Sequence, residues 1–245
     1  MGADGPGGRA EGGVLTGEAA TDRLRTFGRR QDKPLKPRQR RLIETLLPEV
    51  AVGPETVAEA VSGWDGPLWF EVGFGGGEHL AWQAARHPGT LMIGAEPFVN
   101  GVAKLLTQVE EQALSNVRVR HGDARDLMAA MPDGCLGRMF VLHPDPWPKR
   151  RHHKRRIVNQ DLLIEAHRLL APGAELRVSS DIPDYVRWTL MQVRRHRRAT
   201  GAGFAWTATR AADWLERPDD WPQTRYEIKA RREGRPPAYL SFVRR

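Results

Sequence analysis

The sequence predicts an α/β fold with a mostly parallel sheet and an antiparallel C-terminal edge. After Gly66-Pro67, short apolar runs alternate with segments whose apolar residues recur at helical spacing. Strands that alternate with helices are joined by right-handed crossovers, which align the strands in parallel. A second observation agrees with this fold, because acidic residues stand at or just beyond the ends of four successive strands. The 245 residues suffice for one α/β domain with a tail.

Seven segments are expected to form the sheet, and each is a short apolar run of strand length. The parallel strands are predicted at residues 68–74, 90–95, 117–121, 137–143 and 174–180. Two later segments, 204–209 and 238–243, are predicted to form an antiparallel edge pair.

Between the strands, apolar residues gather on one helical face. The helices are predicted at 98–113, 157–170 and 182–198. Asp181 precedes the last of these, where its side chain could serve as the N-cap. Residues 38–62 have helix-like spacing broken at Pro48 and Pro54, so we expect one or two short helices leading into the domain.

Residues 1–35 are predicted to be a disordered tail, and residues 36–245 a single domain. The first part of the tail is rich in glycine and nearly free of large apolar residues, so ordering it would bury little surface. From Arg23 to Arg41, nine basic residues face one acid, Asp32. This stretch is either a basic arm that folds against RNA or a solvated tail.

The composition favours a polyanionic partner. Lysine and arginine number 38 against 30 acids, for a net charge of +8, and nucleic acid is the commonest partner of such a surplus. Cys135 is the only cysteine, so no internal disulfide can form, and no CxxC pair suggests zinc. With no run of about 20 apolar residues and no signal-peptide core, we expect a cytoplasmic protein without a membrane or a metal.

Four acids, Glu71, Glu96, Asp123 and Asp145, stand at or just beyond the ends of successive strands. In open α/β sheets, ligands bind beyond the carboxyl ends of the strands. Glu96 lies where a carboxylate can hold both hydroxyls of a ribose. Asp123 could accept a bond from an adenine amino group, or it could cap the following helix. Together these acids indicate an adenosine-containing cofactor, and NAD and S-adenosylmethionine both carry such a ribose.

A glycine-rich turn follows the first strand, in the sequence E-V-G-F-G-G-G-E that starts at Glu71. Its glycines, Gly73, Gly75, Gly76 and Gly77, allow a sharp turn and the close approach of a ligand. No Gly-Lys-Ser/Thr follows, which argues against a triphosphate-binding loop. The turn predicts a nucleotide-type fold without selecting one cofactor.

The most distinctive segment is H-P-D-P-W-P-K-R-R-H-H-K-R-R, residues 143–156. Its alternating prolines predict a stiff, extended loop that presents Asp145 at the strand end. Trp147 is expected to pack within this loop rather than stack on a base. The basic residues that follow are expected to hold RNA phosphates. They are Lys149, Arg150, Arg151, His152, His153, Lys154, Arg155 and Arg156.

A second polar segment, T-R-Y-E, comprises Thr224, Arg225, Tyr226 and Glu227. It is either a solvated strand edge or a set of groups that hydrogen-bond a base edge. Asp181 is likewise either a helix cap or a substrate contact.

With these motifs in view, the sequence from about residue 36 onward resembles the bacterial tRNA (guanine-N7)-methyltransferase family of the TrmB type. The resemblance rests on P-D-P-W-P-K-R-R-H-H-K-R-R, E-V-G-F-G-G-G-E, G-A-E-P-F, H-G-D-A and T-R-Y-E. It implies a Rossmann-like class I S-adenosylmethionine-dependent methyltransferase fold. It also implies methylation of the guanine at position 46 in the tRNA variable loop.

The resemblance also implies roles for individual residues. Cofactor contacts are implied for Glu71, Gly73, Gly75, Glu96, Asp123 and Asp145. Asp145 is implied to link cofactor and guanine, and tRNA contacts are implied for Lys149, the basic run 151–156, Asp181 and residues 224–227. Three positions depart from the family pattern: His143 replaces an apolar aromatic, Ala230 replaces glycine, and Pro236-Pro237 is unusual.

Guanine N7 carries a lone pair and no proton, so its methylation needs no obligatory base. Asp145 could position the ring by accepting from the N1–H and amino edge, and its charge would favour the cationic product. Base, orienter and electrostatic partner all remain open roles for this carboxylate.

Three other functions remain as alternatives. An S-adenosylmethionine enzyme could instead methylate an exocyclic amine or a protein side chain. The chain could be an RNA-binding module that has lost catalysis, or a nicotinamide oxidoreductase. The sequence allows a monomer or a homodimer and does not select the tRNA species.

Overall fold

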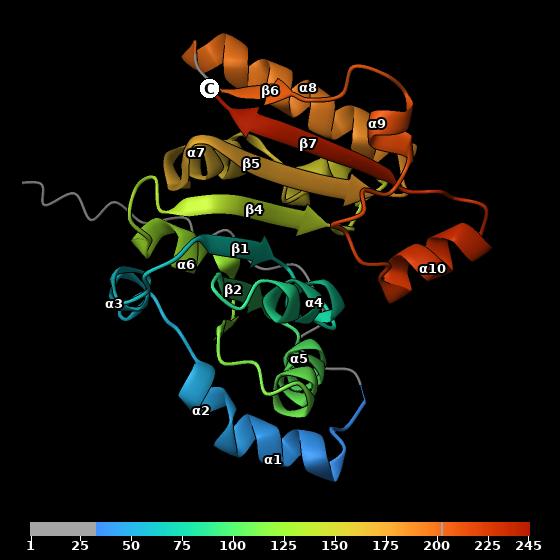
Figure 1. Ribbon diagram of the computed structural model, residues 1–245. Helices are drawn as coiled ribbons and strands as arrows, with labels where there is room; N and C mark the ends of the chain where they lie inside the picture. The colour runs from blue at the N-terminus through green and yellow to red at the C-terminus, as the bar shows by residue number, and fades with distance from the viewer. Residues whose placement is uncertain (1–32, 202) are drawn as a thin grey trace, which may run out of the picture.

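A computed structural model describes residues 33–201 and 203–245 of the chain (Figure 1). Residues 1–32, which include most of the predicted tail and the first half of the predicted basic arm at 23–41, lie outside the described residues. The last residues of the arm belong to α1 (Pro37–Thr45), where Arg38 and Arg41 pair with Glu110. None of the described helices is both long enough and apolar enough to cross a membrane.

The strands form one seven-stranded sheet in the order β3-β2-β1-β4-β5-β7-β6. All pairs among β1 to β5 are parallel, whereas β7 runs antiparallel to both β5 and β6, which confirms the predicted sheet. The strands are β1 (Leu68–Val72), β2 (Leu91–Glu96), β3 (Val117–His121), β4 (Leu136–Leu142), β5 (Leu170–Ser180), β6 (Phe204–Trp206) and β7 (Ala238–Arg244).

Helices cover both faces of this sheet, and the predicted crossovers are present. The helices are α1 (Pro37–Thr45), α2 (Leu47–Val50), α3 (Val57–Ser62), α4 (Glu78–Arg86), α5 (Val99–Glu111), α6 (Ala124–Ala130), α7 (Gln160–Leu169), α8 (Pro183–Thr200), α9 (Ala212–Leu215) and α10 (Arg225–Arg232). A 3-10 helix, η1 (Arg150–Arg155), holds the basic run.

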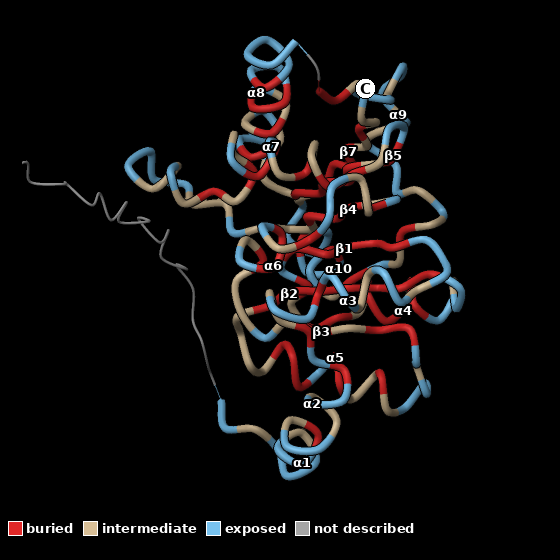
Figure 2. Tube along the Cα trace, turned by 90° about the vertical axis from the view of Figure 1, so that its left-hand side faces the viewer, coloured by how far each residue is buried: buried red, intermediate tan, exposed pale blue. Residues whose placement is uncertain are grey.

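The core has two layers because neighbouring strand residues point to opposite faces of the sheet. Trp69 and Phe140 pack with the apolar sides of α1, α4 and α5. Phe70 and Met139 pack with α6, α7 and α8 on the other face. Figure 2 shows the buried strands between these layers, with α4 on one side of the sheet and α7 and α8 on the other.

β1 is the point where the strand order reverses, because β2 and β4 flank it and their crossovers leave on opposite faces. In open α/β sheets, the crevice beyond the carboxyl ends of such strands is where ligands bind. The four acids predicted from the sequence stand at this edge of the sheet.

Two local predictions were wrong. Residues 224–227 do not form a strand edge, because Thr224 accepts a hydrogen bond from the Glu227 amide and thereby caps α10. Asp181 does not cap α8, which begins after Ile182 and receives no side-chain cap. The Asp181 carboxylate instead accepts a hydrogen bond from Arg235 Nε over 2.9 Å.

Candidate active site

The glycine-rich turn after β1 needs glycine for its backbone and for its packing. Gly73, Gly75 and Gly77 have positive φ angles of 71°, 56° and 77°, which side chains rarely adopt. Gly101, on the first turn of α5, also lies against the turn: a Cβ there would stand 2.1 Å from the Gly75 carbonyl oxygen. Apart from Gly73 and its two neighbours in the chain, no atom of the described residues lies within 4 Å of the place that a Gly73 Cβ would occupy, so the turn is open on that side.

Glu96 links the end of β2 to this turn. The Gly75 amide donates to one carboxylate oxygen over 2.8 Å, and the Phe98 amide donates to the other over 2.9 Å. Burial raises the pKa of Glu96, and these backbone hydrogen bonds oppose the rise only in part. The nearby charges of Asp145 and Glu71 raise it further. The carboxylates at the ends of β1, β2 and β4 therefore lie close enough to interact.

Glu71 is buried, with only 2% of its surface exposed, and His79 lies 2.8 Å from its carboxylate. The Gln83 amide nitrogen lies 3.1 Å from the other ring nitrogen of His79 and donates to the Asp220 carbonyl over 2.8 Å. An amide nitrogen only donates, so His79 Nε2 accepts and Nδ1 donates to Glu71. A buried relay thus fixes the orientation of the Glu71 carboxylate.

Asp123, after β3, is the N-cap of α6, as one of its two predicted roles required. Its carboxylate accepts from the Arg125 amide over 2.9 Å and pairs with the Arg125 guanidinium. This pairing holds the carboxylate at the same edge of the sheet as Glu96. Contact with an adenine stays a prediction.

The loop after β4 is held in an unusual conformation. His143 and Trp147 have φ angles of 47° and 41°, in a region that non-glycine residues avoid. Strained backbone persists only where surrounding contacts impose it, and it gathers at functional sites. One contact comes from the His143 amide, which donates to the Ser179 carbonyl over 3.0 Å.

The second contact is Arg156, which was predicted to bind tRNA. Only 1% of its surface is exposed, so in this structure it is not available to a phosphate. Its Nε donates to the Pro146 carbonyl over 2.9 Å, and its guanidinium lies over the rings of Tyr185 and Trp188. The expectation for Arg156 is therefore corrected: it buttresses the loop from inside.

Asp145 stands between these two supports, and no hydrogen bond or ion pair joins it to the rest of residues 33–201 and 203–245. The residue is open to solvent on one side, yet the surrounding loop removes enough water to raise the pKa of its carboxyl. The Asp145 carboxylate is therefore partly desolvated and makes no hydrogen bond or ion pair with the described residues, which suits a group that meets a substrate.

Trp147 packs within its own loop, as predicted. Its ring lies edge-on to His152, with centroids 5.9 Å apart, and the Arg155 guanidinium lies 4.9 Å from it. Four other basic side chains of the loop are exposed and point to solvent. They are Lys149, Arg150, Arg151 and Lys154.

In α10, the T-R-Y-E segment separates into inward and outward residues. Glu227 is buried and pairs with Arg231 over 2.8 Å and with Arg217 over 3.4 Å. The predicted bond from Glu227 to a base edge is therefore not available in this conformation. Tyr226 is 47% exposed and lies against the glycine turn, because a Cβ on Gly75 would come within 3.2 Å of its ring.

His143, the departure from an apolar aromatic, joins this part of the site. Its ring is stacked with Tyr226, with centroids 6.4 Å apart, and its Nδ1 lies 3.6 Å from Asp181. His143 and then Arg235 lower the pKa of Asp181 to about 2. The ionised Asp181 carboxylate thus lies beside the His143 ring, which is stacked with Tyr226.

Sequence reasoning did not identify four partners of the predicted site residues: the buried His79 and Gln83, and the partly exposed Asp220 and Arg235. Only the first two carry a local signal, since His79 and Gln83 are four residues apart and share one face of α4. Asp220 and Arg235 lie far away in the sequence, and no spacing rule connects them with Glu71 or Asp181.

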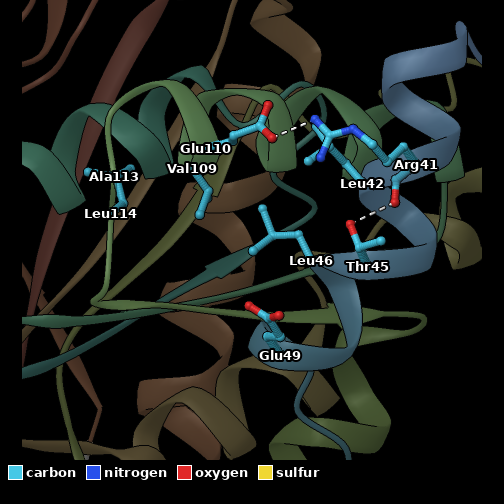
Figure 3. Close-up of a pocket in the computed structure, with 9 residues that line it drawn as sticks. All are labelled: Arg41, Leu42, Thr45, Leu46, Glu49, Val109, Glu110, Ala113 and Leu114. Carbon is cyan, nitrogen blue, oxygen red and sulfur yellow. Dashed lines mark hydrogen bonds and ion pairs between the residues drawn. The ribbon is translucent and has the colours of Figure 1, made fainter.

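A groove of about 350 Å³ lies between α1 and α5 (Figure 3). Its lining includes Leu46, Val109 and Leu114, and the Arg41–Glu110 ion pair crosses it at 2.6 Å. Val109 and Leu114 are at the C-terminal end of α5, whereas Glu96 precedes its N-terminal end. The groove is therefore separate from the acid cluster. Among the described residues, no three metal-binding side chains converge on a common point.

The comparisons with known proteins agree with this geometry. The family described as "Putative methyltransferase" matches residues 65–239. A protein from Rhodospirillum rubrum named tRNA (guanine-N(7)-)-methyltransferase is 48% identical, over 93% of this chain and 91% of the relative. One of the same name from Agrobacterium fabrum is 46% identical, over 89% of this chain and 94% of the relative.

Two solved structures share the fold. The aminoglycoside resistance methyltransferase NpmB1 has a TM-score of 0.52 at 18% identity, covering 79% of this chain and 94% of that one. A variant of the 16S rRNA (adenine(1408)-N(1))-methyltransferase from Catenulisporales acidiphilia, with cosubstrate SAM, has a TM-score of 0.52 at 20% identity, covering 79% and 92%. These likenesses and the strand order show a Rossmann-like class I methyltransferase fold.

Proposed function

The chain belongs to the family of bacterial tRNA (guanine-N(7)-)-methyltransferases, and we propose that it transfers a methyl group from S-adenosylmethionine to N7 of a guanine in tRNA. One structural observation carries this most directly. The acids at the ends of β1, β2 and β4 surround an open glycine turn, and the same loop that bears Asp145 continues into exposed basic residues.

The residues at the glycine turn suit S-adenosylmethionine. Bound there, this cofactor would supply a methyl group on a positively charged sulfur. Glu96 retains lone pairs beyond its two backbone bonds, so it can accept from ribose hydroxyls. Glu71, oriented by His79, adds a fixed carboxylate, and Asp123 adds a third at the end of β3. The negative charge of this cluster complements a cationic cofactor.

Asp145 is proposed as the residue that meets both cofactor and guanine. Its carboxylate can accept from the N1–H and the amino group of the base, which would hold N7 in line with the methyl group. As the ring gains positive charge, a partly desolvated carboxylate nearby stabilises it more than one in bulk water would. Tyr226, exposed beside the glycine turn, can pack against the base or the cofactor.

The exposed basic residues Lys149, Arg150, Arg151 and Lys154 are proposed to hold tRNA phosphates. Such contacts bind the backbone without reading sequence and weaken as salt rises. Arg156 acts indirectly, by fixing the Pro146 carbonyl beside Asp145. The site thus combines sequence-independent binding of RNA phosphates with one positioned carboxylate, Asp145.

Three finer statements belong to the same proposal. The methylated guanine is the one at position 46 of the variable loop. Residues 36–245 act as a single methyltransferase domain, and the reaction takes place in the cytoplasm, where tRNA is found. The family resemblance supports the first two statements.

The test is nucleoside mass spectrometry on unmethylated tRNA incubated with the protein and labelled S-adenosylmethionine. We expect label in N7-methylguanosine, and none from a tRNA whose guanine 46 is replaced by adenine. Label in an exocyclic amine would contradict the proposed nucleophile. Label that survives the replacement of guanine 46 would move the site within the tRNA, and failure to bind S-adenosylmethionine would overturn the enzyme altogether.

A further inference from the structure

Helix α8 (Pro183–Thr200) carries a strongly basic outer surface, the arginine face, which consists of Arg187, Arg194, Arg195, Arg197 and Arg198. All five side chains are exposed. The only acid on the helix is Asp184, in its first turn. The charge of the helix is therefore almost entirely positive and turned to solvent.

The spacing places three of these arginines in one line. Residues four, seven and eleven positions after Arg187 share its side of an α-helix, which are Met191, Arg194 and Arg198. Met191 is 64% exposed, so this line is not covered by the protein. The opposite side of α8 packs into the core through Tyr185, Thr189 and Val193.

Arg194, Arg195, Arg197 and Arg198 make no hydrogen bond or ion pair with any side chain in the described part of the chain. By contrast, two exposed arginines of α1 are paired, since Arg38 and Arg41 each contact Glu110 at 2.6 Å. Like charges three or four residues apart on a helix repel one another. The arginine face therefore opposes folding of the free protein slightly and suits an anionic partner.

The helix dipole explains part of this charge but not all of it. Cations are favoured in the last turn of a helix, and Arg197 and Arg198 lie there. The effect falls off within one turn, so it does not account for Arg194. Arg187 is instead paired with Asp184 over 3.5 Å. A second cause is needed for the charge along the middle of α8.

The arginine face adjoins the basic loop. Arg156 donates to Asp184 over 2.5 Å, and the Trp188 indole donates to the Val158 carbonyl over 2.6 Å. His153 of η1 packs edge-on against Trp188, with ring centroids 5.5 Å apart. The exposed cations of η1 and those of α8 thus belong to neighbouring, firmly joined elements.

We propose that the arginine face is a second tRNA-binding surface, which holds the phosphate backbone beyond the segment bound by Lys149–Lys154. This rests on the proposed function, because the arginine face would bind a further part of the same tRNA substrate. At a rise of about 1.5 Å per residue, Arg198 lies roughly 21 Å along the helix from Asp184. The surface is thus long enough to contact a part of the tRNA away from the target guanine.

The test measures tRNA affinity against salt for the full-length protein carrying R194Q and R198Q. Each lost phosphate contact should lower the slope of log affinity against log salt concentration by about one, so the double variant should lose about two. A charge-matched control, R86Q with R118Q, changes arginines on α4 and β3, at the other end of the sheet, and should keep the wild-type slope.

A short RNA hairpin that carries the target guanine alone distinguishes the two basic surfaces. We expect the R194Q/R198Q protein to bind this hairpin as the wild type does, and to keep its turnover number at saturating tRNA. An unchanged salt slope with whole tRNA, or an equal loss on the hairpin, would overturn the second surface. If the wild type made no N7-methylguanosine while the salt slope still fell, the proposed function would fail and the RNA surface would stand.

Discussion

Arg156 donates a hydrogen bond to the carbonyl oxygen of Pro146, ten residues earlier in the chain. This bond closes the proline-rich loop on the residue that follows Asp145. The basic segment therefore does two different things: its exposed residues face solvent, while its last residue is turned inward against Tyr185 and Trp188. The Asp145 loop and the basic segment are therefore joined by a direct hydrogen bond.

Replacing Arg156 with leucine should lower turnover without changing the salt dependence of tRNA binding, because its guanidinium is buried. Loss of the charged hydrogen bonds should cost about 1.5–3 kcal/mol. This corresponds to a melting temperature lower by roughly 3–12 °C. Thermal unfolding and salt-dependent binding measure the two effects. Replacing exposed Arg151 is the matched control, with a weaker salt dependence and an unchanged melting temperature. A shallower salt slope in the Arg156 variant would restore it as a phosphate contact.

Replacing Asp145 with asparagine or alanine should reduce methyl transfer by about 10²–10³-fold, the usual cost of losing one positioned electrostatic group. The melting temperature should not fall, because Asp145 lies on a loop and has no bonded partner among the described residues. Single-turnover rates with saturating tRNA and cofactor give the comparison. A folded variant with near-normal turnover would remove Asp145 from the mechanism.

The pH dependence follows from the raised pKa of Asp145. Folding disfavours its charged form, so the carboxyl takes up a proton at a higher pH than the ordinary aspartate value of 3.8. Activity that needs the carboxylate should be lost as pH falls through this raised pKa. Above it, the partly desolvated charge opposes folding, so D145N should gain a little stability near pH 7 and none at low pH. A kcat/KM profile paired with unfolding curves tests both signs, and an acid limb below pH 3.8 would contradict them.

His79 is expected to set cofactor affinity through Glu71. Replacing it with leucine leaves a buried carboxylate without its donor, which costs about 1–3 kcal/mol and should weaken S-adenosylmethionine binding about tenfold. Replacement with asparagine, whose amide nitrogen can take the place of Nδ1, should restore most of the affinity. Calorimetric titration with the cofactor compares the two. Equal losses in both variants would show that His79 only fills space.

The sequence alone determined the α/β sheet and most of the acidic residues at the carboxyl ends of its strands. Short apolar runs that alternate with helical segments predict parallel strands, so Glu71, Glu96 and Asp145 were expected at the carboxyl ends of strands, at one edge of the sheet. Local backbone rules likewise anticipated the glycine turn, the constrained proline loop and Asp123 as a possible cap. These are short-range effects, and a window of a few residues contains their causes.

Only the tertiary structure decided which charged side chains are buried in ion pairs and which are exposed. Arg156 and Arg151 look alike in the sequence, yet one is buried against Asp184 and the other is exposed. Glu227 and Asp181 do not take the roles expected of them, because each is paired with an arginine. Arg231 of the same helix pairs with Glu227, and Arg235 pairs with Asp181. Charge pairing depends on distance in space, and contacts such as Arg235 with Asp181 join residues far apart in the chain. A local sequence pattern does not contain this spatial distance. The roles of these charged residues could therefore be assigned only from the folded structure.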